Sequence, residues 1–266
     1  MSAQVAAVFA LTFAIHMTGT LSYALRLAGV STGRIAVAFS LTNLLLLVSR
    51  TSNTFQAPLL AKHVEGNILR GTLGDAEWDF RVLMLAGTLA TVIGGLLLPT
   101  AQTLFADAIV AFGRHRSIPR LVLRALTPVG LRHAAGALRA PSWRGVAGAR
   151  LTGTPLRMAV FNALATALLT VNVFASLYAG CLSPELRLTA NNLSPIVNGL
   201  STILLFVYID PYLSVLTDDV LAGREGESFF RKCVVLFVCA RLAGTLLAQL
   251  LLLPAAQGII IISKLL

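Results

Sequence analysis

Long runs of apolar residues constrain this chain more than any other feature. Six segments are each long enough to cross the hydrocarbon core of a membrane, which takes about 20 mostly apolar residues in a helix. They are residues 3–25, 35–59, 82–112, 158–182, 193–216 and 232–263. Only 12% of all residues are charged, against about 25% in soluble domains. The sequence therefore predicts an all-α, polytopic membrane protein with about six transmembrane helices. The third and sixth segments exceed one crossing, and Pro99 and Pro254 predict a kink or break in each.

The segments that connect these spans differ in charge. Residues 113–157 contain nine arginines and no acidic residue. Apolar residues alternate with arginine there, so we expect amphipathic helices that lie on an anionic membrane surface; a flexible basic loop is the alternative. With six crossings, one side of the membrane carries 14 Lys and Arg residues and the other side carries 5. The positive-inside rule then places this basic linker in the cytoplasm and both termini outside.

The net charge of +10 would also suit a nucleic-acid partner. In a membrane protein, however, basic residues usually reflect topology and contact with anionic lipids. We therefore expect anionic membrane lipids, and no nucleic acid, among the partners.

The two halves of the chain resemble each other. Each half contains three predicted spans, so the first helix of one half runs opposite to the first helix of the other, as in inverted-repeat transporters. The sequence thus predicts an N-terminal three-helix repeat (1–112), the basic linker (113–157) and a C-terminal three-helix repeat (158–266). The matching stretches are AGTLATVIGGLLLPTAQ at 86–102 with AGTLLAQLLLLPAAQ at 243–257, YALRLAG at 23–29 with FASLYAG at 174–180, and Asn43 and Pro58 with Asn198 and Pro211.

Polar residues recur on one face of several predicted spans, at steps of three, four or seven residues. If these faces meet, they line a polar path across the membrane; the alternative is hydrogen bonding between packed helices. The four sets, from the first, second, fifth and sixth spans, are Thr12, His16, Thr20 and Tyr23; Ser40, Asn43, Arg50 and Thr54; Ser194, Asn198, Ser201, Tyr208 and Tyr212; and Arg241, Thr245 and Gln249.

Two arginines within these spans point to an anionic ligand. An arginine at the middle of a membrane costs about 2.5–3.5 kcal/mol on insertion scales, and both Arg50 and Arg241 lie in largely uncharged sequence. Because acidic residues are scarce in the spans, an anionic substrate is the natural partner. Structural pairing with Asp107 or Asp210 is the alternative.

Four other titratable residues are candidates for coupling or gating: His16, Asp210, Asp218 and Asp219. His16 suits a packed core histidine as well as a proton carrier. No nucleotide-binding P-loop and no zinc-protease motif is present, and both have characteristic spacings. We therefore expect neither a cofactor nor a metal.

Five motifs, in this order, resemble the Amj family, the lipid II flippases that act as an alternate to MurJ. The motifs span nearly the whole chain and are TLSYALRLAG at 20–29, SLTNLLLLVSRTSN at 40–53, LYAGCLSPE at 177–185, IDPYLSVLTDDV at 209–220 and ARLAGTLLAQL at 240–250. The resemblance implies a transporter of the bacterial cytoplasmic membrane in cell-wall and cell-shape biogenesis. It would move undecaprenyl-diphosphate-linked disaccharide-peptide, lipid II, from the inner to the outer leaflet.

This substrate suits the polar residues of the spans. A diphosphate favours arginine, which binds it with two parallel hydrogen bonds, and a sugar-peptide head favours Asn, Gln and Tyr. The candidate substrate-binding residues are Arg26, Arg50, Arg241, Asn43, Asn53, Gln56, Asn198 and Tyr23. Two alternatives stay open: a membrane-embedded enzyme and an accessory subunit that act on the same polyprenyl carrier. A homodimer is possible.

Overall fold

A computed structural model describes residues 3–69, 76–115, 117, 120, 123, 127–139 and 155–266. Every regular element in this part of the chain is helical. In chain order the elements are α1 (Ala3–Thr32), α2 (Ile35–Leu69), α3 (Ala76–Leu96), α4 (Leu98–His115), α6 (Pro128–Gly136), α8 (Leu156–Leu182), η2 (Pro184–Leu186), α9 (Arg187–Asn192), α10 (Ser194–Ile203), η3 (Leu204–Ile209), α11 (Asp210–Leu221) and α12 (Glu227–Leu265).

Six stretches of the described chain are long and apolar enough to cross a membrane: α1, α2, α3, α8, the run Pro184–Leu221, and α12. The prediction of an all-α, polytopic membrane protein is therefore confirmed. The fifth stretch contains the π-helical turn η3 just before Pro211. Proline cannot donate a backbone hydrogen bond, and π-turns often occur near functional sites.

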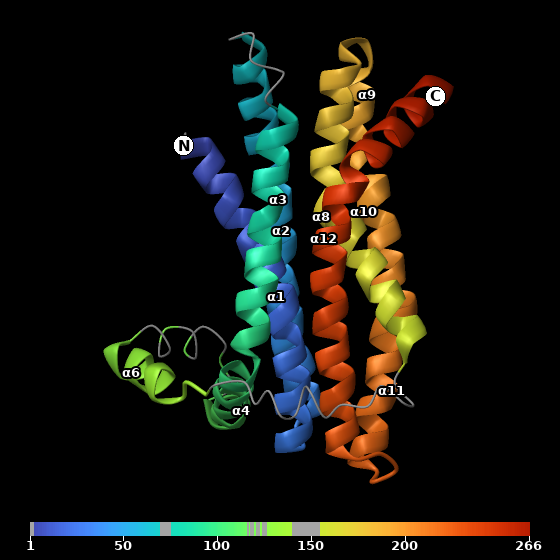
Figure 1. Cartoon of the computed structure of the whole chain (residues 1–266). Helices are drawn as coiled ribbons and strands as arrows, with labels where there is room; N and C mark the ends of the chain where they lie inside the picture. The colour runs from blue at the N-terminus through green and yellow to red at the C-terminus, as the bar shows by residue number, and fades with distance from the viewer. Residues whose placement is uncertain are drawn as a thin grey trace.

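The long helices form one elongated bundle in which α1–α3 lie on one side and α8–α12 on the other (Figure 1). Both termini lie toward the same end of the bundle (Figure 1). The other end, called the basic end below, holds α4, α6 and the turn between α11 and α12. The charge count grouped α6 and the turn between α11 and α12 on one side of the membrane, whereas most of α4 belonged to the predicted third span.

The first span is longer than predicted. α1 continues to Thr32 rather than residue 25, because its last turns are buried in the bundle. The backbone N–H groups of Gly33 and Arg34 donate to the carbonyl oxygens of Val30 and Gly29, and Gly33 has a φ of 65°. This arrangement is a Schellman motif, which ends helices at a glycine. Arg26 therefore lies inside a helix and not in a connecting loop.

The two prolines act differently. The predicted span 82–112 is not one helix: α3 begins earlier, at Ala76, and α4 is a separate helix with Pro99 as its second residue. Figure 1 shows that α4 turns away from the direction of the bundle. Pro254 instead lies within the continuous helix α12, which bends toward its C-terminal end in Figure 1. A proline in a helix removes one backbone hydrogen bond and permits such a bend.

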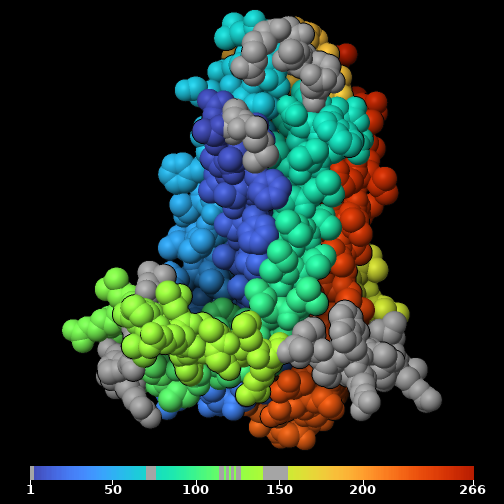
Figure 2. All heavy atoms as spheres, turned by 60° about the vertical axis from the view of Figure 1, so that its left-hand side comes forward, coloured from blue at the N-terminus to red at the C-terminus, as the bar shows by residue number. Residues whose placement is uncertain are grey.

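The described part of the basic linker lies across the outside of the bundle at the basic end (Figure 2). There Thr127 caps α6 by accepting a hydrogen bond from the N–H of Gly130. Two contacts tie α6 and the residues after it to α4: His133 Nε2 of α6 is 2.9 Å from Asp107 Oδ2, and Thr100 Oγ1 accepts a hydrogen bond from the N–H of Arg139. The side chains of Arg120, Arg132 and Arg139 are exposed, while Arg124 lies outside the described residues.

Candidate functional site

One polar face of α1 is buried against both halves of the bundle. Thr12, His16, Thr20 and Tyr23 are spaced three or four residues apart, which puts them on one face, and all are buried. The other helices supply their partners. Gln56 Nε2 of α2 donates to Thr12 Oγ1 over 2.8 Å, and His16 Nε2 lies 3.3 Å from Thr170 Oγ1 of α8. This face is called the polar seam below.

An asparagine of α8 joins the seam to α12. Tyr23 donates its hydroxyl hydrogen to Asn162 Oδ1 over 3.2 Å, and Asn162 Nδ2 donates to the carbonyl oxygen of Phe237 over 2.9 Å. The Tyr23 ring also stacks on Phe237, with ring centroids 6.2 Å apart. Three helices from both halves therefore meet at one hydrogen-bonded point.

Arg241 of α12 lies beside this seam as a buried cation. Its residue is only 4% exposed, and its Nε and Nη2 atoms have no hydrogen-bond partner among the described residues. A Cβ atom at Gly19 would lie less than 3.0 Å from Arg241 Nη2, so the glycine of α1 makes room for the guanidinium. Each unsatisfied buried polar group costs about 1–3 kcal/mol. Arg241 therefore has hydrogen-bonding capacity that this part of the protein leaves unused.

The two aspartates considered as partners for Arg241 are engaged elsewhere. Asp107 contacts His133, and Asp210 Oδ1 accepts a hydrogen bond from Arg26 Nη2 over 2.5 Å. Neither aspartate forms an ion pair with Arg241 or with Arg50. The alternative of structural pairing for Arg50 and Arg241 is therefore wrong for these aspartates, and the observed pair involves Arg26.

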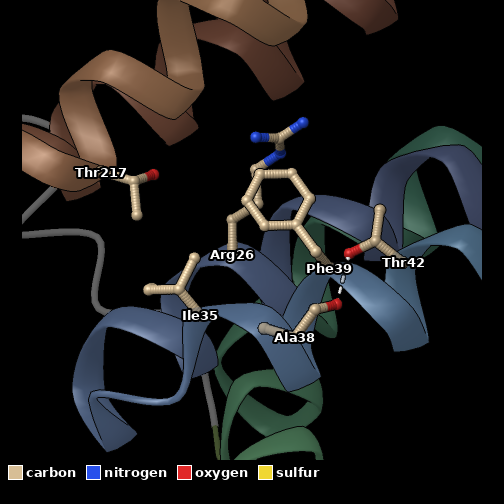
Figure 3. A pocket seen from close by; sticks show the side chains of 6 residues that line it. All are labelled: Arg26, Ile35, Ala38, Phe39, Thr42 and Thr217. Carbon is tan, nitrogen blue, oxygen red and sulfur yellow. Dashed lines mark hydrogen bonds between the residues drawn. The ribbon is translucent and has the colours of Figure 1, made fainter.

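Arg26 and Asp210 connect the two halves near the basic end. Arg26 is 9% exposed, and its Nη1 atom has no hydrogen-bond partner in the described chain. The guanidinium also lies over the Phe39 ring, 5.2 Å from the centroid. A cleft opens beside it, lined by Arg26 from α1, by Ile35, Ala38, Phe39 and Thr42 from α2, and by Thr217 from α11. Figure 3 shows Thr217 facing these residues from the opposite side.

Residues 11–263 match the family described as Amj, alternate to MurJ. The chain belongs to the Amj family. A protein of Bacillus subtilis (strain 168) called lipid II flippase Amj is 37% identical over 262 residues, which are 98% of this chain and 97% of that protein. No solved structure matches the chain. The sequence-based assignment to Amj is thus confirmed, and the family relationship is to a transporter rather than an enzyme.

The predicted polar face of α2 does not join the seam of this Amj-family chain. Asn43 and Arg50 are exposed and Asn53 is half-buried, whereas Gln56 is buried. Arg50 lies over the Phe206 ring of η3, 5.5 Å from its centroid. The polar path required the polar stripes to face one another, and the stripe of α2 does not meet this condition because its residues Ser40, Asn43, Arg50 and Thr54 are exposed. This helix buries Thr42, Ser52 and Gln56 instead.

The remaining candidates lie on the run 184–221. Asn198 is half-buried on α10. Asp218 is exposed near the end of α11, and Asp219 Oδ1 is 2.6 Å from Arg224 Nη2. The structure brings neither aspartate to the seam. Both belong to the last turn of α11, and the turn that joins α11 to α12 lies at the basic end (Figure 1).

Sequence reasoning missed the polar face of α8 in this Amj relative. Asn162, Thr166 and Thr170 are buried at steps of four residues and lie opposite α1 or α12. The four-residue spacing was visible in the sequence. Threonines in a strongly apolar segment, however, give a weak signal, because Thr often bonds back to its own helix, as Thr166 does to the carbonyl of Asn162.

Proposed function

We propose that this protein flips lipid II from the inner to the outer leaflet of the bacterial cytoplasmic membrane by alternating access. The observation that carries the proposal is Arg241: a cation buried between the two halves with no counter-charge among the described residues. Its proposed role is to bind the diphosphate while the head group crosses.

An arginine in this setting suits a transient anion. A mid-membrane arginine costs about 2.5–3.5 kcal/mol on insertion scales, and here no described carboxylate offsets that cost. Its Nε and Nη2 atoms, which have no partner among the described residues, are the two donors with which arginine forms two parallel hydrogen bonds to a phosphate. Tyr23, Asn162 and Gln56 border the same seam and supply hydrogen-bonding groups for a sugar-peptide head.

Glycine contacts support the predicted inverted repeat. The AGTL motifs of the two halves match Gly87 of α3 in sequence to Gly244 of α12. A Cβ at Gly87 would meet His16 of α1, and one at Gly244 would meet Ala163 and Thr166 of α8. In each half, then, the third helix packs on the first through the same glycine of the motif. We infer a division into 1–112, 113–157 and 158–266.

Aromatic pairs between the halves support the same symmetry. The AGTL register pairs Phe80 with Phe237, and the first-helix motifs pair Tyr23 with Phe174. Tyr23 contacts Phe237, and Phe174 contacts Phe80 with ring centroids 5.8 Å apart. Such reciprocal contacts are the pattern of a two-fold arrangement. The superposition of the two halves by a rotation of about 180° stays a prediction.

The proposed orientation puts the basic end in the cytoplasm and both termini outside. The membrane potential then helps a negatively charged head to move outward, by about 2.3 kcal/mol per charge per 100 mV. To test the orientation, single cysteines replace Glu225 or Lys264 in a chain whose native cysteines are changed to serine. An impermeant maleimide added outside intact cells is expected to label position 264 and not 225. The opposite pattern would contradict the orientation.

The function itself is tested in vesicles that contain only the purified chain. Lipid II carrying a fluorescent head group starts in the inner leaflet, and its appearance outside is read with an impermeant quencher. We expect transfer well above that of empty vesicles, with lipid II recovered chemically unchanged. Altered lipid II would favour the membrane-embedded enzyme. No transfer, even though the chain is folded, would favour the accessory subunit.

The linker is expected to act as a surface for anionic lipids. Val129, Leu131 and Leu138 of the linker are exposed beside its arginines, and each basic residue near an anionic surface contributes about 1 kcal/mol. Changing Arg120, Arg124, Arg132 and Arg139 to glutamine is expected to slow flipping about fivefold or more at limiting lipid II. The effect should vanish in vesicles without other anionic lipid. If rate and lipid affinity are unchanged in both vesicle types, the arginines serve topology alone.

A further inference from the structure

A small, mostly apolar cleft lies beside Arg26, a buried cation whose hydrogen-bonding capacity is only partly used. Arg26 is 9% exposed and lines the cleft, and its Nη1 atom has no partner in the described chain. Its other terminal nitrogen, Nη2, donates to Asp210. The guanidinium thus has one buried donor without a partner among the described residues and one donor held by a carboxylate.

The cleft lies where the two halves separate. α2 packs mainly on α1, and α10 packs mainly on α8, whereas α2 and the run α10–α11 do not pack closely on each other. Their facing sides meet through Arg50 over Phe206. Arg50 is eight residues beyond Thr42 on the same helix, or about 12 Å at 1.5 Å per residue. A second cation therefore stands above the cleft on the way toward the opposite end.

We propose that this cleft is the loading site for the diphosphate of a polyprenyl-linked lipid, and that the diphosphate displaces Asp210 from Arg26. This inference rests on the proposed flippase function. Asp210 acts as an internal substitute for the substrate's anion and keeps Arg26 neutralised when no lipid is bound. A diphosphate carries more charge than one carboxylate and engages both terminal nitrogens of the guanidinium. The Asp210 side chain, 35% exposed, can turn toward water when it is displaced.

The helices on either side of Arg50 and Phe206 expose side chains that suit the hydrocarbon chain of such a lipid. On α2 and on the α10–η3 run, large apolar side chains are exposed: Leu47, Val48, Leu200, Ile203, Phe206 and Val207. A polyprenyl tail would remain among these side chains and the membrane lipids while its diphosphate is held at Arg26.

Among the described residues, the opposite end of the bundle has no counterpart of the Arg26–Asp210 pair at the positions that the repeat relates to it. Under the predicted repeat, YALRLAG with FASLYAG matches Arg26 to Leu177, and the matched prolines relate Asp210 to Ala57. Both Leu177 and Ala57 belong to one apolar cluster of the core. The described positions that the repeat relates to Arg26 and Asp210 are thus apolar, as expected for a carrier whose loading site is at the basic end.

Binding measurements on two variants test the proposal. The purified chain in nanodiscs is titrated with lipid II, with phosphatidylglycerol and inorganic pyrophosphate as comparison ligands. Arg26→Gln is expected to weaken lipid II binding about 10- to 100-fold, the loss of charge-assisted hydrogen bonds. Asp210→Asn removes the competing carboxylate and is expected to tighten binding about two- to fivefold. Arg224→Gln, which breaks an exposed ion pair at the same end, is expected to bind as wild type does.

The opposite signs of the two effects distinguish a loading site from a structural latch, meaning an Arg26–Asp210 ion pair that only stabilises the fold. A latch predicts that both variants lose binding and thermal stability together, and that result would overturn the proposal, as would wild-type affinity in both. Equal binding of phosphatidylglycerol or of pyrophosphate alone would overturn the assignment to a polyprenyl diphosphate. If wild type flips lipid II and the opposite effects are absent, only the loading site fails. If the opposite effects appear but wild type does not flip, the proposed function fails and the binding site remains.

Discussion

Replacing Arg241 with glutamine is expected to reduce lipid II flipping about 100-fold or more while the protein still inserts and folds. Glutamine keeps hydrogen-bonding capacity but loses the charge and the paired donors, and charge-assisted hydrogen bonds contribute about 1.5–3 kcal/mol each. Because the charge has no counter-ion among the described residues, its removal is expected to leave the unfolding temperature unchanged or higher. Transport is read by leaflet transfer in vesicles, and stability by thermal unfolding in detergent.

The matched control is Lys264→Gln, which removes an exposed cation from the same helix and is expected to flip at the wild-type rate. Two results would contradict the role of Arg241. Normal flipping by the Arg241 variant would exclude it from substrate binding. A large loss of folded protein would show that the arginine is a structural element.

Valine at position 244 is expected to destabilise the bundle by about 3 kcal/mol, the upper part of the usual range for overpacking. A Cβ at Gly244 would lie less than 3.0 Å from the backbone oxygen of Ala163, and a backbone atom in a packed helix cannot move aside. α12 would have to separate from α8. Valine at position 87 is expected to cost less, because the atoms it meets belong to the side chain of His16.

Gly258→Ala is the control for the glycine prediction. This glycine lies on the same helix, and a Cβ there would meet nothing within 4 Å. The variant is therefore expected to be stabilised by up to about 1 kcal/mol, through the higher helix propensity of alanine and without a packing penalty. Unfolding is followed by the temperature at which the purified protein loses its near-ultraviolet circular dichroism. Equal stability of Gly244→Val and Gly258→Ala would refute the close packing of α8 on α12.

The spans and the polar face of α1 could be predicted from sequence because both depend on periodicity. Thr12, His16, Thr20 and Tyr23 repeat at helical spacing in an otherwise apolar segment, so only one face is available for polar contacts. α2 is different, because it carries polar residues on two faces. Spacing groups Asn43 with Arg50 and Ser52 with Gln56, but it does not say which group packs inside, and the structure buries the second.

Arg26 shows that prediction from sequence is limited at the end of a helix as well. The charge suggested that the first span stops before it, but Gly33 is the residue that ends the helix. The four apolar residues after Arg26 are buried in the bundle, so the arginine is carried inside with them. Its pairing with Asp210 joins positions 184 residues apart, which no local pattern reveals.

Alternating access is the central claim, and distances across the two ends of the bundle test it most directly. Spin labels at the exposed positions Ala36 and Leu221 report the basic end, and labels at Trp78 and Leu188 report the opposite end. During lipid II transport in vesicles, we expect the two distances to change in opposite directions: one end widens as the other narrows. Arg241→Gln should suppress both changes. Constant distances at both ends, with wild-type transport proceeding, would contradict the account.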